Sequence, residues 1–589
     1  MSEYTYPHNE ALFLFNRVLR IPELCQQAGL DELNDELISA VLGEAARFGS
    51  ERLAPSNRDG DLNPAYMTDD GVQEPSGFAE LYREFCDAGW PALIAPTEFG
   101  GQGLPNVLSV AVHEIWNSAN LSWALAPLLT QGAMEALVAH GSDQLKSRWL
   151  AKLVSGEWTG TMNLTEPDAG SDLAALRTRA EPEGDHYRIK GQKIFITWGD
   201  HKMASNIVHL VLARLPDAPP GVKGISMFLV PKYLLDENGE PGEKNDLRAV
   251  SLEHKMGIHG SPTCVMSYGE TQGAIGYLVG EEHQGLACMF TMMNSARQAV
   301  GLQGLAVAER AYQAARQYAR ERVQGEIDGQ RVTIIHHPDV RRMLAQMKAA
   351  NEAMRALAYE AAAEVDRARL AGDEQSRAAH EARVALYTPI VKGWLTELAQ
   401  EVVSLAMQTH GGMGYIEETG VAQYVRDARI LPIYEGTTGI QALDLVGRKI
   451  LADQGRALEA LLADIDASLA AADRAGERVK QRMAQALSTV RETIALLMEG
   501  GENDPLSARA GCVGLMMQLG YLCGGWMQLR ASQCAGELLL QGEGDEPFLM
   551  ARQLSAELYA DLLLPRSESL KYAILTNASA LMAIGEEQF

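Results

Sequence analysis

Glu435 has surroundings that suit a general base. It lies in the run LPIYEGTTGIQ (Leu431–Gln441), between an apolar approach that ends at Tyr434 and a Gly-Thr-Thr turn. A carboxylate in mostly apolar surroundings has a raised pKa and can accept a proton from a weak acid. A glutamate before a glycine is more often a solvated turn residue, so this segment alone leaves both interpretations open.

Two further segments combine hydroxyl groups with small or aromatic residues. MNLTEPDAGSDL carries Thr165 and Ser171 among small residues that let a ligand approach the backbone closely. KIFITWGDH is an alternating strand that ends at Thr197 and Trp198, whose side chains could lie against a planar cofactor. Taken alone, a sharp connection between domains explains the first segment and a buried strand end explains the second.

Two helix ends carry groups that could meet a phosphate. Arg320 and Arg322 end a long predicted helix just before Gly325, where cations ordinarily balance the helix dipole. QTHGGMGYIEE (Gln408–Glu418) contains a G-G-x-G run, but it follows a helix and not a strand. It therefore predicts a helix C-cap and turn, not a Rossmann fingerprint.

Other kinds of chemistry lack their residues. The chain has seven cysteines and no C-x-x-C pair, which argues against a disulfide framework, a cysteine zinc site and a redox dithiol. His336 and His337 are adjacent, and His254 and His259 are five apart, so no metal site is expected. The sequence contains neither G-x-S-x-G nor G-x-x-x-x-G-K-[ST].

Composition limits the class of protein. The chain has 589 residues with 51 Lys and Arg against 77 Asp and Glu, a net charge of −26. This length allows about three to five domains. The acidic balance argues against binding nucleic acid or anionic membranes. No apolar stretch reaches about 18 residues, so no transmembrane helix is expected. The N-terminus lacks a secretory signal, and a reducing, cytoplasmic location is expected.

Helices must position these segments on both sides of a β region. Short alternating runs without intervening helices predict an antiparallel sheet, with strands at His186–Gly199, Asn206–Leu215 and Gly224–Lys232. Helices are predicted over Val107–Asn117 and Ser122–His140, and long ones over Cys288–Val323, Pro338–Ala371 and Ser376–Gln408. The Ala/Leu-rich segment after 454 is also helical, so bundles follow the sheet. The expected fold class is α+β, mainly α.

In this order and spacing, the segments resemble the acyl-CoA dehydrogenase family of flavoproteins. The matches cover about residues 36–450 and are TEPDAGSD, KIFITWG, LEHKMGIHGSPT, QTHGGMGY, YEGTTGIQ, and Arg297 followed 25 residues later by Arg322. The resemblance implies an N-terminal helical domain, a central antiparallel β domain and a C-terminal four-helix bundle, with FAD as cofactor. The implied segments are an arm (1–35), the three domains (36–160, 161–286, 287–453) and an extra helical domain (454–589).

The resemblance also implies a role for each matching residue. Glu435 corresponds to the base that removes a proton α to the thioester carbonyl of an acyl-CoA. The β-hydride then passes to the flavin, which gives a trans-2-enoyl-CoA. The thioester oxygen is held by the backbone N–H of the base and a ribityl hydroxyl of FAD, the logic of an oxyanion hole.

Binding residues follow in the same way. The implied FAD contacts are Met162, Leu164, Thr165, Phe195 and Thr197 around the flavin, Thr437, and Arg322, Gln324, Gln408, Gly411 and Gly412 toward the FAD of a partner subunit. Ser171 is also counted with the cofactor contacts, and it is expected to reach the pyrophosphate arm of CoA. The implied substrate contacts are Ser171, Asn294, Arg297 and Tyr434, with Ala124 and Leu128 at the floor of the acyl pocket.

The chain departs from the family pattern at a few places. Phe195 stands where many members have tryptophan, and stacking on the flavin should survive the change. Gly439 stands where many have a glutamine that contacts FAD. Some relatives carry their base just before Arg297, but Ala296 occupies that place here, so Glu435 has no competitor. A glutamate at position 435 also argues against desulfinase-like relatives.

The arm and the tail after about 454 resemble a large subgroup that contains bacterial long-chain enzymes and 3-methylthiopropionyl-CoA dehydrogenases. A packed tail covers the surface through which smaller relatives pair dimers into tetramers, so a homodimer is expected.

Three activities remain open. The first is dehydrogenation of medium-to-long fatty acyl-CoA in β-oxidation, with electrons passed to an electron-transferring flavoprotein. The second is the same chemistry on 3-methylthiopropionyl-CoA, and the third is an acyl-CoA oxidase. A DNA-associated flavoprotein is disfavoured by the net charge of −26 and by Glu435.

Overall fold

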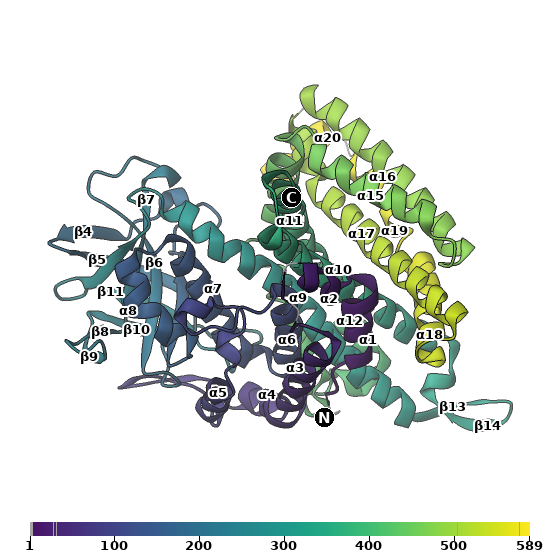
Figure 1. The fold of residues 1–589 in the computed structure, drawn as a ribbon, viewed down its shortest axis with the longest axis horizontal. Coiled ribbons are helices and arrows are strands. Elements are labelled where there is room, and N and C mark those ends of the chain that lie inside the picture. Colours follow the sequence, from purple (N-terminus) through teal and green to yellow (C-terminus); the bar gives the residue numbers. More distant parts are fainter. Residues whose placement is uncertain (1–3, 28, 31, 504, 576–577) are drawn as a thin grey trace. The chain divides into compact units, whose positions relative to one another are not determined.

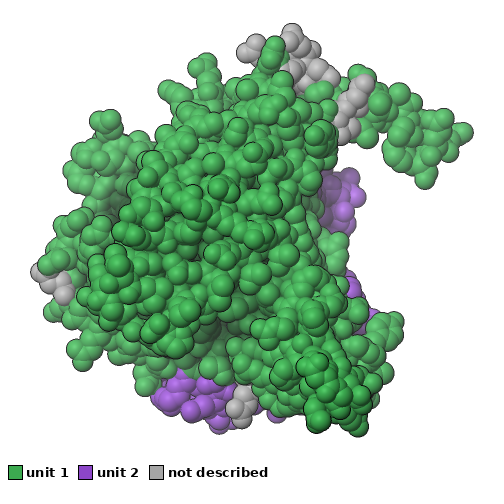
Figure 2. Space-filling model, turned by 90° about the vertical axis from the view of Figure 1, so that its right-hand side faces the viewer, with its two compact units in different colours: residues 1–46, 106–115, 300–589 green, residues 47–105, 116–299 purple. Residues whose placement is uncertain are grey.

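The computed structural model describes residues 4–27, 29–30, 32–503, 505–575 and 578–589. It confirms the mainly helical α+β fold (Figure 1). Along the sequence, the β region follows the first helices and precedes the long ones, and further helices come after 454. The chain forms two compact units (Figure 2). Unit 1 comprises Met1–Ala46, Asn106–Ile115 and Val300–Phe589, and unit 2 comprises Arg47–Pro105 and Trp116–Ala299. Residues 1–3, 28 and 31 of the expected arm lie outside the described part of the chain.

Unit 2 is built on a twisted sheet with the order β10-β11-β5-β12-β7-β6-β3, and β4 pairs with β5 and β6. The strands are β3 (Trp158–Asn163), β4 (Arg179–Glu183), β5 (His186–Thr197), β6 (Asn206–Arg214), β7 (Ile225–Pro231), β10 (Leu247–Leu252), β11 (Thr263–Tyr268) and β12 (Ala274–Val279). Most neighbours are antiparallel, as expected, but β3 runs parallel to β6 from Trp158↔Asn206 to Asn163↔Val211. A long connection sets this pairing, so no local turn signal reveals it.

Helix α7 (Leu121–His140) packs against β3. Their close approach depends on Gly160, because a Cβ there would lie 2.4 Å from the Cβ of Ala133. Helix α8 (Asp143–Val154) completes this core. The buried ring of Trp149 on α8 packs against the buried ring of Trp158 on β3, and the two centroids are 5.2 Å apart. The remaining elements of unit 2 include α4 (Ala54–Leu62), α5 (Phe78–Asp87), β1 (Tyr66–Thr68), β2 (Gly71–Gln73), β8 (Tyr233–Leu235) and β9 (Pro241–Lys244).

Unit 1 is helical. Its long helices are α9 (Gly285–Glu321, which begins in unit 2), α10 (Pro338–Leu370), α11 (Glu374–Ile390) and α12 (Thr396–Thr409). The single helix expected over 376–408 is divided by a π-turn at Val391–Leu395. Pro389 lacks the backbone N–H that a continuous α-helix needs, and the hydrogen-bond ladder changes register directly after it. A hairpin of β13 (Val323–Ile327) and β14 (Gln330–Thr333), which was not predicted, follows α9.

The helices after 454 pack as a layer on the bundle. They are α15 (Arg456–Ala471), α16 (Glu477–Asn503), α17 (Pro505–Gln541), α18 (Glu546–Leu562), α19 (Arg566–Ile574) and α20 (Ala578–Met582). Helix α17 contacts α10 and the π-turn. Gly520 makes room for Trp394 of the π-turn, because a Cβ at Gly520 would lie 2.2 Å from that side chain. Other helices of the chain are α1 (His8–Phe13), α2 (Ile21–Gln27), α3 (Asp35–Phe48), α6 (Asn106–Ala119), α13 (Val421–Ala428) and α14 (Thr438–Leu443).

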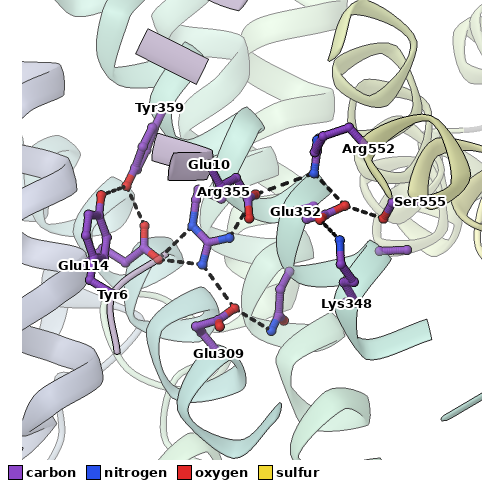
Figure 3. Close-up of polar contacts among 12 residues, drawn as sticks. Tyr6, Glu10, Glu114, Glu309, Lys348, Glu352, Arg355, Tyr359, Arg552 and Ser555 are labelled. Carbon is purple, nitrogen blue, oxygen red and sulfur yellow. Dashed lines mark hydrogen bonds and ion pairs between the residues drawn. The ribbon is translucent and has the colours of Figure 1, made fainter. Parts of the chain in front are cut away.

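A buried ionic network ties the N-terminal arm to the helices of unit 1 (Figure 3). Arg355 of α10 lies 3.0 Å from Glu10, 2.8 Å from Glu114 and 3.1 Å from Glu309. Arg552 of α18 also approaches Glu10, at 3.7 Å. Glu10 of the arm therefore lies between two arginines that belong to different helical layers.

Within the described residues, no helix combines the length and apolar character that a membrane span requires. The same residues contain no group of three or more His, Cys, Asp or Glu side chains arranged to hold a metal ion.

Candidate active site

Phe195 stands out from the sheet because β5 carries a bulge. Cys264 pairs with Ile196 and Met266 pairs with Lys193, so β5 has one residue more than β11 between these pairs. Phe195 has φ +60° and its side chain is 58 % exposed, which is unusual for a large apolar residue on a strand. Bulges of this kind re-aim a side chain and are common beside active sites.

The segment after β3 lies against this bulge. The backbone N–H of Ile194 donates to the carbonyl of Thr165 at 2.9 Å. The ammonium of Lys193 donates to the carbonyl of Leu164 at 3.0 Å. The structure therefore brings together the residues predicted to surround the flavin, which come from the end of β3 and the bulge of β5: Met162, Leu164, Thr165, Phe195 and Thr197.

A buried ion pair, which the sequence did not predict, anchors this arrangement. The Lys193 ammonium lies 2.8 Å from the carboxylate of Glu166, and neither side chain is more than 6 % exposed. Burial lowers the pKa of Lys193 to about 8, although Glu166 opposes the shift. Burial alone would raise the pKa of Glu166, but Lys193 and Thr178 outweigh it and hold that pKa below its usual value. The pair fixes the loop after β3 to β5.

Two buried histidines of unit 2 line the other side of β3. His201 accepts from the N–H of Met203 on Nδ1, so its Nε2–H faces the Thr159 hydroxyl at 2.9 Å. His209 lies 2.7 Å from the Thr161 hydroxyl. Burial lowers the pKa of each imidazole to about 3. The charge of Lys232 assists the shift at both rings, and Asp200 opposes it at His209. Both rings are therefore neutral in the folded protein.

Acid should weaken unit 2 through these two histidines. The unfolded chain binds a proton on each ring near pH 6.5, whereas the folded chain does so only near pH 3. Above pH 6.5 neither state is protonated at these rings, so they do not lower the unfolding free energy. Below pH 6.5 each ring lowers the unfolding free energy by about 1.4 kcal/mol per pH unit. We expect His209→Gln to reduce the slope of unfolding free energy against pH by about that amount between pH 6.5 and 4. Urea unfolding followed across pH measures this slope, and above pH 7.5 the difference from wild type should stay constant. If His209→Gln has the same slope as wild type below pH 6.5, then His209 already binds a proton in the folded state in that range.

The remaining candidates in unit 2 lie on two helices and one loop. Ala124 and Leu128 share one face of α7 and are both buried. Asn294 and Arg297 lie on α9; Asn294 is exposed, while Arg297 is buried with its guanidinium 5.9 Å from the Phe290 ring. Ser171 is exposed in the loop that follows β3.

In unit 1, Glu435 occupies a strained and firmly held loop. Its φ is +55°, in the left-handed region that non-glycine residues rarely adopt, and Gly436 follows with φ +88°. The side-chain amide of Gln441 donates to the Glu435 carbonyl at 3.0 Å, and the Lys392 ammonium donates to the Gly436 carbonyl at 2.6 Å. The hydroxyl of Tyr434 donates to Gln303. Thr437 accepts from the N–H of Ile440 and caps α14.

The predicted phosphate-contacting residues also meet in unit 1. The rings of Tyr318 and His410 stack with centroids 4.5 Å apart, and the N–H of Arg322 donates to the Tyr318 carbonyl. This contact places the end of α9 beside the turn after α12. The exposed residues brought together there are Arg322 and Gln408, Gly411 and Gly412, with Gln324 on the adjoining β13.

The residues present fit a flavin nucleotide. An exposed aromatic ring held out by a bulge, with the Thr165 and Thr197 hydroxyls nearby, suits the face and polar edge of a planar ring system. An arginine beside backbone N–H groups of a glycine turn suits phosphate.

Comparison with known families agrees with this geometry. The descriptions that match are "Acyl-CoA dehydrogenase, N-terminal domain" over residues 38–157, the "middle domain" over 161–270, the "C-terminal domain" over 283–451, and "Acetyl-CoA dehydrogenase C-terminal like" over 461–585. The chain therefore belongs to the acyl-CoA dehydrogenase family, and it is an FAD-dependent oxidoreductase.

Individual relatives extend over nearly the whole chain. It is 48 % identical to the 3-methylmercaptopropionyl-CoA dehydrogenase of Ruegeria pomeroyi, over 95 % of this chain and 96 % of that one. It is 35 % identical to the broad-specificity linear acyl-CoA dehydrogenase FadE5 of Mycobacterium tuberculosis, over 100 % of both. The structure of Caenorhabditis elegans ACDH-11 in complex with C11-CoA has a TM-score of 0.78 at 19 % identity, covering 99 % of this chain and 95 % of that one, which shows the shared fold.

Proposed function

We propose that this chain converts an acyl-CoA to the trans-2-enoyl-CoA, with Glu435 as the base that removes the α-proton. The observation that carries the proposal is the left-handed conformation of Glu435, held by two donors from buried side chains. Strained non-glycine residues persist where the surrounding structure over-determines them, and they cluster at active sites.

Different residues of the chain have different roles in this reaction. The Glu435 carboxylate takes the α-proton, and the backbone N–H of Glu435 donates to the thioester oxygen, where negative charge develops. Phe195, Thr165 and Thr197 hold the flavin at unit 2. The chemistry that FAD supplies when bound is acceptance of the β-hydride. An electron-transferring flavoprotein is the proposed acceptor of the electrons, and fatty acid β-oxidation is the proposed setting.

Medium-to-long acyl chains are the proposed substrates. Ala124 and Leu128 share a face of α7, and a small residue with an apolar one leaves space for a longer chain. Each added buried CH₂ stabilises binding by about 0.8 kcal/mol.

A second candidate substrate is 3-methylthiopropionyl-CoA. The relative from Ruegeria pomeroyi, 48 % identical over nearly the full length, bears the name of that activity and favours this candidate. The two substrate classes require the same proton and hydride chemistry, so only the pocket distinguishes them.

Turnover of a substrate panel with a dye acceptor tests both candidates. The panel contains saturated C4 to C16 acyl-CoA and 3-methylthiopropionyl-CoA, with oxygen as a parallel acceptor. We expect higher kcat/KM for C8 to C16 than for C4, and Ala124→Trp should move the optimum to shorter chains. A preference for C4 or for the thioether would reject the chain-length proposal, and peroxide formed at the dye rate would identify an oxidase.

A homodimer is the proposed assembly. Beside the glycine turn, the side chains of Met413, Tyr415 and Ile416 are 48 %, 85 % and 44 % exposed, which suits an interface where Arg322 meets the FAD of a partner. The layer after 454 packs on the bundle. We propose that it covers the surface through which smaller relatives pair dimers into tetramers. Light scattering should give a mass near twice 64.0 kDa, and a mass near four times that value would contradict the proposal.

The proposed domain division remains 1–35, 36–160, 161–286, 287–453 and 454–589. A reducing, cytoplasmic location is also proposed, and it suits seven cysteines that are all free thiols.

A further inference from the structure

Lys392 is a buried cation that points at the loop of the proposed base. It lies in the π-turn Val391–Leu395 and is 0 % exposed, as are its neighbours Trp394 and Leu395. Its ammonium donates to the carbonyl of Gly436, the residue after Glu435, at 2.6 Å. Burying an ammonium is costly unless it is hydrogen-bonded, and π-turns within helices occur frequently at functional sites.

Gln441 is a second donor to the same loop. It lies on α14, is 0 % exposed, and its amide donates to the carbonyls of Glu435 at 3.0 Å and Gly436 at 3.4 Å. The approach is close, because a Cβ on Gly436 would lie 2.8 Å from the Gln441 nitrogen. The carbonyls of two consecutive residues, Glu435 and Gly436, therefore each have a buried side-chain donor.

These donors matter because the loop is strained. A left-handed conformation costs a non-glycine residue about 1–2 kcal/mol, so without a compensating contact Glu435 would relax to the right-handed or extended region. Such relaxation would turn both the Cα–Cβ bond and the backbone N–H of Glu435. The Glu435 carbonyl lies in the peptide plane between residues 435 and 436, and the Gly436 carbonyl lies in the next plane. Fixing these two planes fixes the backbone on the C-terminal side of the Glu435 Cα, and with it the direction of the Cα–Cβ bond that carries the base.

We infer that Lys392 and Gln441 are positioning residues that hold Glu435 in its left-handed conformation and so aim its carboxylate. The inference rests on the proposed function, because it assigns these residues a role in proton removal by Glu435. They act through the loop, and neither needs to contact the substrate.

Proton removal can be measured without turnover. An acyl-CoA with α-hydrogens but no β-hydrogen, 3,3-dimethylbutanoyl-CoA, can lose an α-proton but has no hydride to give. Exchange of its α-hydrogens in D₂O, followed by mass spectrometry on the holoenzyme, reports the base alone. A misplacement of about 1 Å costs on the order of 10²-fold. We therefore expect Lys392→Met and Gln441→Met each to lower both α-exchange and kcat by about that factor, with KM within about threefold of wild type.

The controls separate positioning from folding. Lys392→Arg keeps a buried cationic donor and should recover at least tenfold over Lys392→Met. Lys449→Met, on the same unit but away from the loop, should match wild type. FAD content and the unfolding midpoint are measured for every variant.

Three results would overturn the inference: α-exchange within about threefold of wild type in folded Lys392→Met or Gln441→Met, a change confined to KM, or no recovery in folded Lys392→Arg. Should Lys392→Met fail to fold, Gln441→Met decides, since it preserves length and removes only the donor. Glu435→Gln distinguishes failure of this inference from failure of the proposed function. If that variant loses exchange while the positioning variants do not, only the inference fails; if it keeps exchange, the proposed function fails.

Discussion

Glu435→Gln should abolish nearly all acyl-CoA dehydrogenation while the protein stays folded and retains FAD. An amide cannot accept the α-proton, yet it keeps the volume of the side chain and leaves the backbone N–H and the Gln441 contact in place. A positioned general base contributes about 10²–10⁴-fold, so kcat should fall by that factor with a small change in KM. Steady-state turnover with a dye acceptor and flavin absorbance measure both properties.

The matched control for this variant is Glu381→Gln, which makes the same change at an exposed position on α11. It should keep full activity. Should Glu435→Gln retain more than about a tenth of the wild-type kcat, another group must remove the proton, and the assignment of the base would be wrong.

The order of the helices and strands could be predicted because its signals are local. Alternation marked β5, β6 and β7, and apolar periodicity marked α7, α9 and α10, whose observed bounds agree closely with the predicted ranges. The parallel pairing of β3 with β6 could not be predicted in the same way, because the partners are separated by about 48 residues and by other strands.

The backbone geometry of the site also escaped sequence reasoning. Phe195, Trp198 and Glu435 have φ values of +60°, +52° and +55°, although none is a residue type that favours this region. Long-range contacts impose these conformations: the N–H of Trp198 bonds to Pro262, and its indole donates to Ser122. A sequence motif proposes which residues form a site, but it does not reveal the backbone strain at those residues.

The supporting cations were missed for a related reason. Lys193 lies on an alternating strand and Lys392 lies in the apolar run TPIVKGWL. Each bonds to a partner 27 or more residues away, the buried Glu166 carboxylate for Lys193 and the Gly436 carbonyl for Lys392. The sequence did offer one signal, which is a lysine at a position where the pattern of apolar residues predicts a buried side chain. That signal predicts that the lysine has a hydrogen-bond partner, but it does not identify the partner.

The second large effect should come from Arg355→Met, which removes the centre of the buried network in unit 1. The guanidinium is 1 % exposed and contacts Glu10, Glu114 and Glu309. Removing one partner of a buried ion pair leaves uncompensated charge and costs about 3–5 kcal/mol. Urea unfolding followed by circular dichroism should show that loss at pH 7.5, whereas Arg342→Met, at an exposed pair with Asp339 on the same helix, should cost less than about 1 kcal/mol.

The pH dependence of this loss separates lost charge compensation from lost packing. Burial raises the pKa of the Glu114 carboxyl, and Arg355 opposes that shift. Without Arg355 the folded-state pKa of Glu114 rises further above its unfolded value, so the folded variant takes up a proton as the pH falls. A group with a raised carboxyl pKa destabilises the fold at high pH and is relieved below its folded pKa. The gap in unfolding free energy between wild type and Arg355→Met should therefore narrow from pH 7.5 to pH 5. The titration of His201 and His209, which is common to both proteins, cancels in that difference. A gap that stays constant with pH would show that Arg355 contributes mainly through the packing of its aliphatic stem.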